Sequence, residues 1–206
     1  MSSTSAVAHG LLLAAGRGRR AGGPKALLAD ATGRPWVVHA VHTLREGGCA
    51  RVSVVVGAAA DEVRAVLADE DVDVVAAADW SDGMGASLRA GLTALDGTDA
   101  QIACVHLVDL PDVGSDVVAR LLTAAAGVGT LVRATYASGP GHPVLLGRSH
   151  WPAVRAAARD DTGARSYLAA TPVRLVDCSD LAGGRDVDGP RGLPLAASAT
   201  AEVPGA

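Results

Sequence analysis

Phenylalanine is absent from this sequence of 206 residues, and other aromatic side chains are scarce, with three Trp and two Tyr. Hydrophobic residues nevertheless make up 49% of the chain, and Ala, Val and Leu dominate among them. A chain of this length and apolar content can bury the core of one α/β domain. That core has to be built from small aliphatic side chains packed between layers.

Cysteine is also scarce, and Cys49, Cys104 and Cys178 stand far apart without a CxxC pair. This odd, dispersed set argues against a disulfide framework and against a zinc site. Cys104 lies in an apolar, strand-like run and is expected to be a small core residue. His106, in the same run, is expected to be a buried histidine with a satisfied partner. Dispersed cysteines of this kind predict a cytoplasmic protein.

Long apolar stretches are missing too, so no membrane-spanning helix is expected. The first eight residues lack the basic and apolar parts of a signal peptide and are expected to form a flexible leader. The net charge is −4 and no basic run occurs, which argues against a nucleic-acid partner. We expect one domain over residues 9–192, with flexible termini at 1–8 and 193–206.

Short β-like apolar runs alternate with longer helical stretches along the chain. The run Gly10–Ala15 is continuously apolar, which is typical of a strand buried on both faces. Regular alternation predicts parallel strands joined by helical crossovers, hence a doubly wound, mostly parallel sheet in a three-layer α/β/α, Rossmann-like fold. Ser115 is expected to cap one helix, and Gly139–Gly141 to form the turn of a late hairpin. Further strands are expected at 52–56, 72–76, 102–108, 130–136, 143–146 and 173–176, and helices at 35–47, 60–67, 86–95, 115–126, 149–159 and 163–169.

A glycine-rich segment, Leu13–Lys25 (LAAGRGRRAGGPK), directly follows the first predicted strand. In doubly wound sheets, ligands bind beyond the carboxyl ends of the strands. The four glycines let backbone N–H groups approach an anion closely. Arg20 and Lys25 add positive charge suited to a polyphosphate. A loop wrapped around a triphosphate is therefore favoured over a flexible surface loop with solvated arginines.

Two other phosphate-binding motifs fit this segment less well. A dinucleotide fingerprint matches the bare spacing Gly16-x-Gly18-x-x-Ala21, but Gly22–Pro24 interrupts the helix that should follow. The next strand also ends in Gly57 where an acidic residue is required. A P-loop needs Lys directly after its last glycine, and here Pro24 intervenes.

Two acidic segments are candidates for a metal site. Asp109 follows the predicted strand 102–108 and is expected on the same rim as the glycine-rich loop, where it can hold Mg²⁺ against a triphosphate. The alternative is an aspartate that begins a turn before Pro111. Asp188, in the segment Asp186–Pro190, is the second candidate, and an exposed acidic turn is the alternative there.

The segment Leu13–Lys25 resembles the LAAGxSxRMGxPK signature of the MobA-like nucleotidyltransferases, which include enzymes that attach CMP or GMP to molybdopterin. Gly18 replaces the usual Ser, and Ala21 the usual Met. Other parts of the chain resemble further segments of the family. VDLP resembles the family's LGDxP, and DVDGP resembles its DIDTPEDL. DWSDGMGASLRAGL resembles DWxxGMxxSLxxGL, GHPVL resembles GxPVLF, and DTGAR resembles GDxGARxLL. The resemblance covers roughly Leu11–Pro190.

This resemblance implies a role for each matching residue. Arg20, Lys25 and Asp109 are expected to be catalytic, and Asp109 and Asp188 to bind Mg²⁺ or Mn²⁺. His142 and Arg165 are expected to contact a phosphorylated acceptor. The nucleotide is expected to contact Leu13, Ala14, Ala15, Gly16, Gly18, Arg20, Gly22, Lys25, Gly83 and Ser87.

Within the family, the chain is most similar to the molybdopterin cytidylyltransferase branch. That branch implies CTP as substrate, molybdopterin as acceptor, and transient contact with a molybdoenzyme or its chaperone. The GTP-using branch and a sugar- or alcohol-phosphate nucleotidyltransferase remain as alternatives. The departures at Gly18, Ala21 and Gly189 motivate a different class, a non-catalytic nucleotide sensor on the same fold. A dinucleotide oxidoreductase is the weakest alternative, for the reasons given for the loop.

Overall fold

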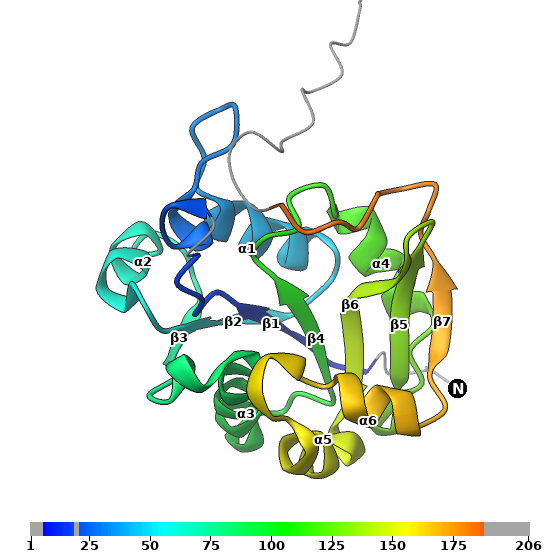
Figure 1. Ribbon diagram of the computed structural model, residues 1–206. Helices are drawn as coiled ribbons and strands as arrows, with labels where there is room; N and C mark the ends of the chain where they lie inside the picture. Colours follow the sequence, from blue (N-terminus) through cyan, green and yellow to red (C-terminus); the bar gives the residue numbers. More distant parts are fainter. Residues whose placement is uncertain (1–5, 19–20, 188–206) are drawn as a thin grey trace, which may run out of the picture.

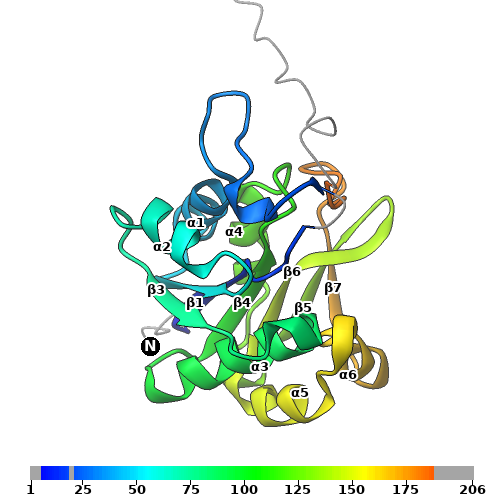
Figure 2. The ribbon, with the colours of Figure 1, turned by 60° about the vertical axis from the view of Figure 1, so that its left-hand side comes forward.

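A computed structural model of the chain describes residues 6–18 and 21–187 (Figure 1). Arg20 and Asp188, both expected at the site, lie outside these residues. In the described part, one seven-stranded sheet carries helices on both faces, which confirms the three-layer α/β/α architecture (Figures 1 and 2). None of the described helices is long and apolar enough to cross a membrane.

The sheet is mostly parallel, as predicted. Its strands are, in spatial order, β3 (Asp73–Ala76), β2 (Arg51–Val56), β1 (Ala8–Leu13), β4 (Ile102–Leu107), β6 (Gly139–Gly147), β5 (Leu131–Tyr136) and β7 (Arg174–Asp177). Strand β6 runs antiparallel to β4 and β5, and the other neighbouring pairs are parallel. One face carries α1 (Trp36–Glu46), α2 (Ala60–Val66) and α4 (Ser115–Thr123), and the other α3 (Met84–Ala94), α5 (Trp151–Ala157) and α6 (Arg165–Ala170). Single 3₁₀ turns are η2 (Lys25–Leu27), η3 (Trp80–Asp82), η4 (Leu95–Gly97), η5 (Gly127–Gly129), η6 (Arg148–His150) and η7 (Asp160–Thr162).

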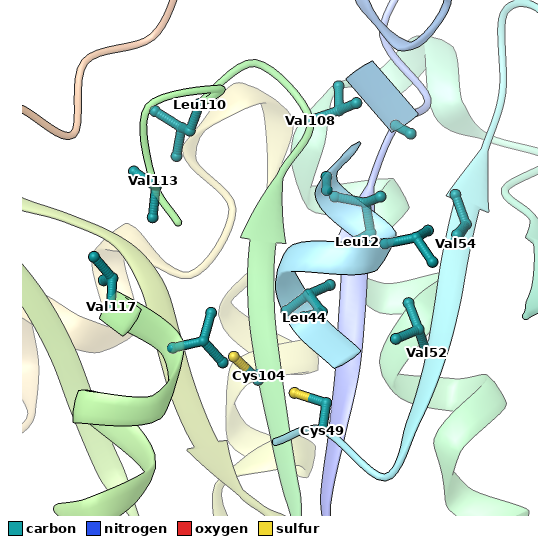
Figure 3. Close-up of a cluster of buried hydrophobic side chains, with 14 of the residues drawn as sticks. Leu12, Leu44, Cys49, Val52, Val54, Cys104, Val108, Leu110, Val113 and Val117 are labelled. Atoms are coloured by element: carbon teal, nitrogen blue, oxygen red, sulfur yellow. The ribbon is translucent and has the colours of Figure 1, made fainter. Parts of the chain in front are cut away.

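The sheet separates two hydrophobic cores. Leu11 and Leu12 of β1 are both fully buried, yet they belong to opposite cores because successive side chains of a strand alternate between faces. This explains the continuously apolar run at the first strand. Cys49 and Cys104 lie in the core beneath α1 and α4 with their sulfur atoms facing each other (Figure 3). Both are free thiols, which confirms the prediction of Cys104 as a core residue.

Two local predictions were wrong at the ends of elements. Ser115 is the first residue of α4 rather than its N-cap, which is Gly114 without a side-chain hydrogen bond. The segment Gly139–Gly141 begins β6 instead of forming the hairpin turn, which falls at residues 137–138. The strand extends this far because Pro140 still pairs with Thr135 of β5.

His106 is buried as predicted, with 1% of its surface exposed, but its environment differs from the expectation. Its Nδ1 atom has no hydrogen-bond partner among the described residues. Burial lowers the pKa of His106 to about 3, so the ring is neutral at physiological pH. His106 lines neither cavity of the site described next, although its neighbour Leu107 lines both.

Candidate functional site

The candidate site lies where β1 and β4 end side by side in the middle of the sheet. The chain leaves β1 towards β2 and leaves β4 towards the β5–β6 side, so the connecting segments diverge and leave a crevice. A first cavity of about 720 Å³ opens there. Its lining residues come from the glycine-rich loop, η3 and the start of α3, the end of β4, and η7: Leu13, Ala15, Gly16, Arg17, Gly18, Lys25, Trp80, Ser81, Gly83, Met84, Ser87, Leu107, Val108, Asp109 and Asp161.

The glycine-rich loop folds back on itself at Gly18. The carbonyl oxygen of Gly18 accepts hydrogen bonds from the N–H groups of Ala21 and Gly23 at 2.9 and 3.2 Å. Gly18 has a φ of 59°, and a Cβ atom there would lie 1.9 Å from the carbonyl oxygen of Gly23. A side chain cannot occupy this position without moving the loop. The geometry thus accounts for glycine where the family signature has serine.

Lys25 connects this loop to the end of β4. Its Nζ atom donates a hydrogen bond to Oδ2 of Asp109 at 2.9 Å, within an ion pair whose side chains are 16% and 21% exposed. The carbonyl oxygen of Asp109 accepts a hydrogen bond from the N–H of Val187 at 2.9 Å. The described chain therefore runs up to the residue before Asp188 in contact with Asp109. Lys25 is the only lysine of the sequence.

The start of α3 forms the opposite wall of the first cavity. Gly83 is the N-cap of this helix, with a φ of 101°, and Ser87 in its first turns is buried. A Cβ atom on Gly83 would lie 2.6 Å from the backbone of Asp160, so the glycine allows α3 to pack against η7. The N–H groups of the first turn and the positive end of the helix dipole are suited to polar groups of a nucleotide.

Trp80 and Arg17 also line the first cavity, although sequence reasoning assigned them no role. The Arg17 guanidinium carbon lies 4.7 Å from the centre of the Trp80 ring. The ring covers Gly57, where a Cβ atom would lie 2.6 Å from Cγ of Trp80. In a dinucleotide-binding fold, the acidic residue that binds the ribose lies at the end of the second strand. Here Gly57 follows β2, and the Trp80 ring occupies the space beside it. The sequence feature that could have indicated a role for Trp80 is a rare aromatic residue three positions before Gly83.

A second cavity of about 330 Å³ adjoins the first. His142 and Arg165, the two residues expected at the acceptor, line it together with Arg133, which was not predicted. The two cavities share five lining residues: Leu13, Met84, Leu107, Asp109 and Asp161. A ligand in the first cavity and one in the second therefore meet at Asp109.

His142 is uncharged in this surrounding. Burial, and then the charges of Arg133 and Arg165, lower the pKa of His142 to about 4. The imidazole can donate or accept a hydrogen bond at physiological pH, but it cannot supply a positive charge. The cationic groups of the second cavity are the two arginines.

Some predicted site residues do not reach the cavities. Ala14 is buried in the core beneath α1, and Gly22 is exposed and lines neither cavity. Both belong to the loop that shapes the first cavity, so a structural role suits them better than direct contact. Arg20 and Asp188 lie outside the described residues.

Asp109 is one of two described carboxylates that line both cavities, the other being Asp161, and it also contacts Lys25 of the glycine-rich loop. Among residues 6–18 and 21–187, no group of three or more His, Cys, Asp or Glu side chains converges on one point. Mg²⁺ needs only one or two carboxylates when triphosphate oxygens and water complete its octahedron. Asp109 lines the first cavity beside the glycine-rich loop, so its carboxylate fits such an ion.

Comparison with known proteins bears on the identity of this crevice. Residues 10–175 match the family described as MobA-like NTP transferase domain. A nicotine blue oxidoreductase of Paenarthrobacter nicotinovorans is 42% identical over 189 residues, covering 87% of this chain and 91% of that protein.

Solved structures agree with this relationship. Rv0371c of Mycobacterium tuberculosis superimposes with a TM-score of 0.76 at 29% identity, covering 90% of this chain and 94% of that chain. Its complex with manganese gives 0.68 at 27% identity, covering 84% and 88%. A nucleotidyl transferase from Methanothermobacter thermautotroptrophicus gives 0.75 at 25% identity, covering 90% and 93%. The family match includes the glycine-rich loop and most of the residues that line the two cavities, and the chain belongs to the MobA-like NTP transferase family.

Proposed function

We propose that the protein is a divalent-metal-dependent nucleotidyltransferase that moves CMP from CTP onto a phosphorylated acceptor such as molybdopterin and releases pyrophosphate. One observation carries this proposal: the glycine-rich loop and Asp109 meet through Lys25 at the rim where two cavities join. The first cavity is large enough for a nucleoside triphosphate, and the second can hold the acceptor with its phosphate close to Asp109.

The chemistry of the transfer agrees with the residues present. A phosphate monoester has a second pKa of ~6 and is mostly ionised at neutral pH, so it attacks the α-phosphorus without a general base. The neutral His142 is consistent with this, because it is needed only as a hydrogen-bonding group. Lys25 and Arg20 neutralise the β- and γ-phosphates as pyrophosphate leaves, while Gly83 and Ser87 contact the base or ribose. Catalysis then consists of alignment and charge neutralisation.

Asp109 and Asp188 are the residues that would hold Mg²⁺ or Mn²⁺. A bound divalent ion draws charge from the triphosphate oxygens and so stabilises the leaving pyrophosphate. The manganese complex of Rv0371C supports a divalent site in this fold. Lys25 has to exchange its contact with Asp109 for contacts with phosphate when such an ion is held.

Thermal-shift measurements with CTP, GTP, ATP and UTP, each with Mg²⁺, test the donor. We expect the largest stabilisation from CTP, and pyrophosphate release when CTP and a phosphorylated pterin are supplied together. Preference for GTP in both assays would replace CTP with GTP in the proposal. Nucleotide binding without pyrophosphate release, unchanged in Asp109→Ala, would instead support the nucleotide sensor.

A second candidate function follows from the relative that is 42% identical over most of both chains and is named an oxidoreductase. A reduced nicotinamide dinucleotide could extend across both cavities, with its pyrophosphate near Asp109. It could not adopt the usual dinucleotide pose, because Trp80 covers Gly57. Titration with NADH and NADPH distinguishes the two functions. Tight binding of either dinucleotide, with no release of pyrophosphate from any triphosphate, would favour the reductase.

A further inference from the structure

The guanidinium of Arg133 is held rigidly in the second cavity. It projects from β5 and crosses to β6, where its Nε and Nη2 atoms donate hydrogen bonds to the carbonyl oxygens of Gly141 and Pro140, both at 3.0 Å. A guanidinium has five N–H donors in a planar fork. Two of them are used here, so three stay available in a fixed orientation.

Arg165, at the start of α6, brings a second guanidinium to the same cavity. The two charges influence each other, since burial and then the charge of Arg165 lower the pKa of Arg133. Among the residues that the structure describes, neither guanidinium has a carboxylate within ion-pair distance. By contrast, Arg120 and Arg155 each pair with an aspartate. Asp109, Asp161 and Asp186 also line this cavity, but none of them forms an ion pair with either guanidinium. Two neighbouring cations that lack a direct ion pair repel each other, and an anion bound between them relieves this repulsion.

We propose that Arg133 and Arg165 together grip the phosphate of the acceptor, and that this grip selects a phosphate monoester dianion over a monoanionic diester. The inference rests on the proposed function and extends it to the residues that recognise the acceptor. Guanidinium forks bind phosphate oxygens in pairs, and the three terminal oxygens of a monoester can accept from both arginines at once. A diester offers two charged oxygens at most and carries half the charge.

The remainder of the second cavity indicates what carries this phosphate. Its wall beside β4 and β6 is formed by the aliphatic side chains of Leu88, Val105, Val144 and Leu146. These residues belong to the core between the sheet and α3, so the wall is firm and apolar. An acceptor with a compact apolar or heterocyclic body at one end and a phosphate monoester at the other matches this division.

Binding measurements with simple probes test the grip independently of turnover. Phenyl phosphate is the probe, with phenyl methyl phosphate as the monoanionic diester and phenol as the uncharged form, each titrated by calorimetry. We expect phenyl phosphate to bind at least about tenfold more tightly than either comparison compound. Arg133→Gln and Arg165→Gln should each weaken it about ten- to hundredfold. Arg174→Gln is the matched control, because Arg174 lies on β7 and donates to the carbonyl oxygen of Ala124.

Calorimetry with CTP and Mg²⁺ separates the failure of this inference from the failure of the proposed function. Unchanged CTP affinity in Arg133→Gln, with lost phenyl phosphate binding, supports the grip. Equal phenyl phosphate affinity in the wild type and Arg133→Gln overturns it, even if CTP binds and pyrophosphate is released. Arginine-dependent binding of phenyl phosphate without any binding of nucleotide would uphold the grip and refute the transferase. Rescue by Arg133→Lys would also count against it, since lysine supplies charge without a fork.

Discussion

Lys25 Nζ lies 2.9 Å from Asp109 Oδ2, so the cation of the glycine-rich loop and the acid at the end of β4 neutralise each other. A triphosphate competes for the lysine, and a divalent cation competes for the aspartate. The two ligands therefore help each other to bind, because each removes the partner that the other has to displace. Nucleotide and metal are therefore expected to bind with positive coupling.

Acylation of Lys25 provides a direct assay of this pair, since the chain has no other lysine. We expect CTP with Mg²⁺ to slow the reaction of Lys25 with an acetylating reagent at least about threefold, because phosphate oxygens then enclose the ammonium group. Mass spectrometry of the peptide that contains Lys25 gives the rate, and an unstructured lysine-containing peptide added to the same reaction serves as the reference. Equal rates with and without CTP would contradict contact between Lys25 and the nucleotide.

Asp109→Asn is predicted to reduce pyrophosphate release about a hundredfold, since the loss of one charged contact in the transition state removes on the order of 3 kcal/mol. The shape of the side chain is kept, so the stability of the fold should change little. Asp61→Asn is the control, because Asp61 forms an exposed pair with Arg64 on α2. Retained activity in Asp109→Asn would mean that the metal is held elsewhere.

Gly18→Ser restores the residue of the family signature, yet we expect it to weaken CTP binding about tenfold. The left-handed backbone and the contact with the carbonyl of Gly23 disfavour any side chain by on the order of 1–3 kcal/mol. The thermal midpoint should stay close to that of the wild type, since the loop lies outside both cores. Ala21→Met, the other departure from the signature, is the control and should bind CTP normally. Improved CTP affinity in Gly18→Ser would show that the loop takes another conformation with nucleotide.

Trp80 should report nucleotide binding through its fluorescence. Trp36 and Trp151 are each only 1% exposed in the two cores, whereas Trp80 lines the first cavity beneath Arg17. CTP with Mg²⁺ is expected to change the emission of the wild type and to leave that of Trp80→Leu unchanged. Calorimetry of the variant with CTP shows whether binding itself persists. A full signal in Trp80→Leu would assign the change to a core rearrangement.

The buried His106 predicts how stability depends on pH. Its folded pKa of about 3 lies below the unfolded value of ~6.5, so the unfolded chain takes up the proton first as the pH falls. The contribution of His106 is therefore complete above pH ~6.5 and is lost between there and pH ~3, at about 1.4 kcal/mol per pH unit. His142 acts in the same direction.

Urea unfolding at about pH 7.5 and about pH 5.5 measures this effect. His106→Gln should lose about 1 kcal/mol less than the wild type between these two pH values, whatever its stability at the higher pH. An identical loss in both proteins would show that His106 is protonated in the folded state or is hydrated.

The fold could be predicted closely from the sequence because the apolar pattern is clearest in the strands at the centre of the sheet. The apolar residues 11–13 of the first strand are buried on both faces, and the alternation of strands and helices predicts the observed, mostly parallel sheet. The weakest prediction concerned Gly139–Gly141, where glycine and proline indicated a turn but cross-strand pairing with β5 extended β6. Local propensity is overruled there by a partner that lies elsewhere in the chain.

The candidate site was predictable in part for a similar reason. Asp109 follows the end of β4 and Lys25 closes the loop that follows β1, and the carboxyl ends of parallel strands share one rim. Arg133 could not be predicted as a site residue because it lies in the middle of a strand. The orientation of its guanidinium depends on hydrogen bonds to carbonyl groups of β6. The role of Trp80 could not be predicted because its position over Gly57 results from packing between segments that are distant in the sequence. The family signature carried no information on either contact.

The crevice between the ends of β1 and β4 has a consequence for how this family diverges. Most of the side chains around it belong to segments that follow the strands, while the two cores hold the architecture together. Exchanges at the rim can redirect reactivity and leave folding almost untouched. Identity summed over the whole length therefore mainly records shared ancestry of the scaffold. The few residues around the crevice determine the reaction, so a transferase and an oxidoreductase of common descent are expected to differ mainly at these positions.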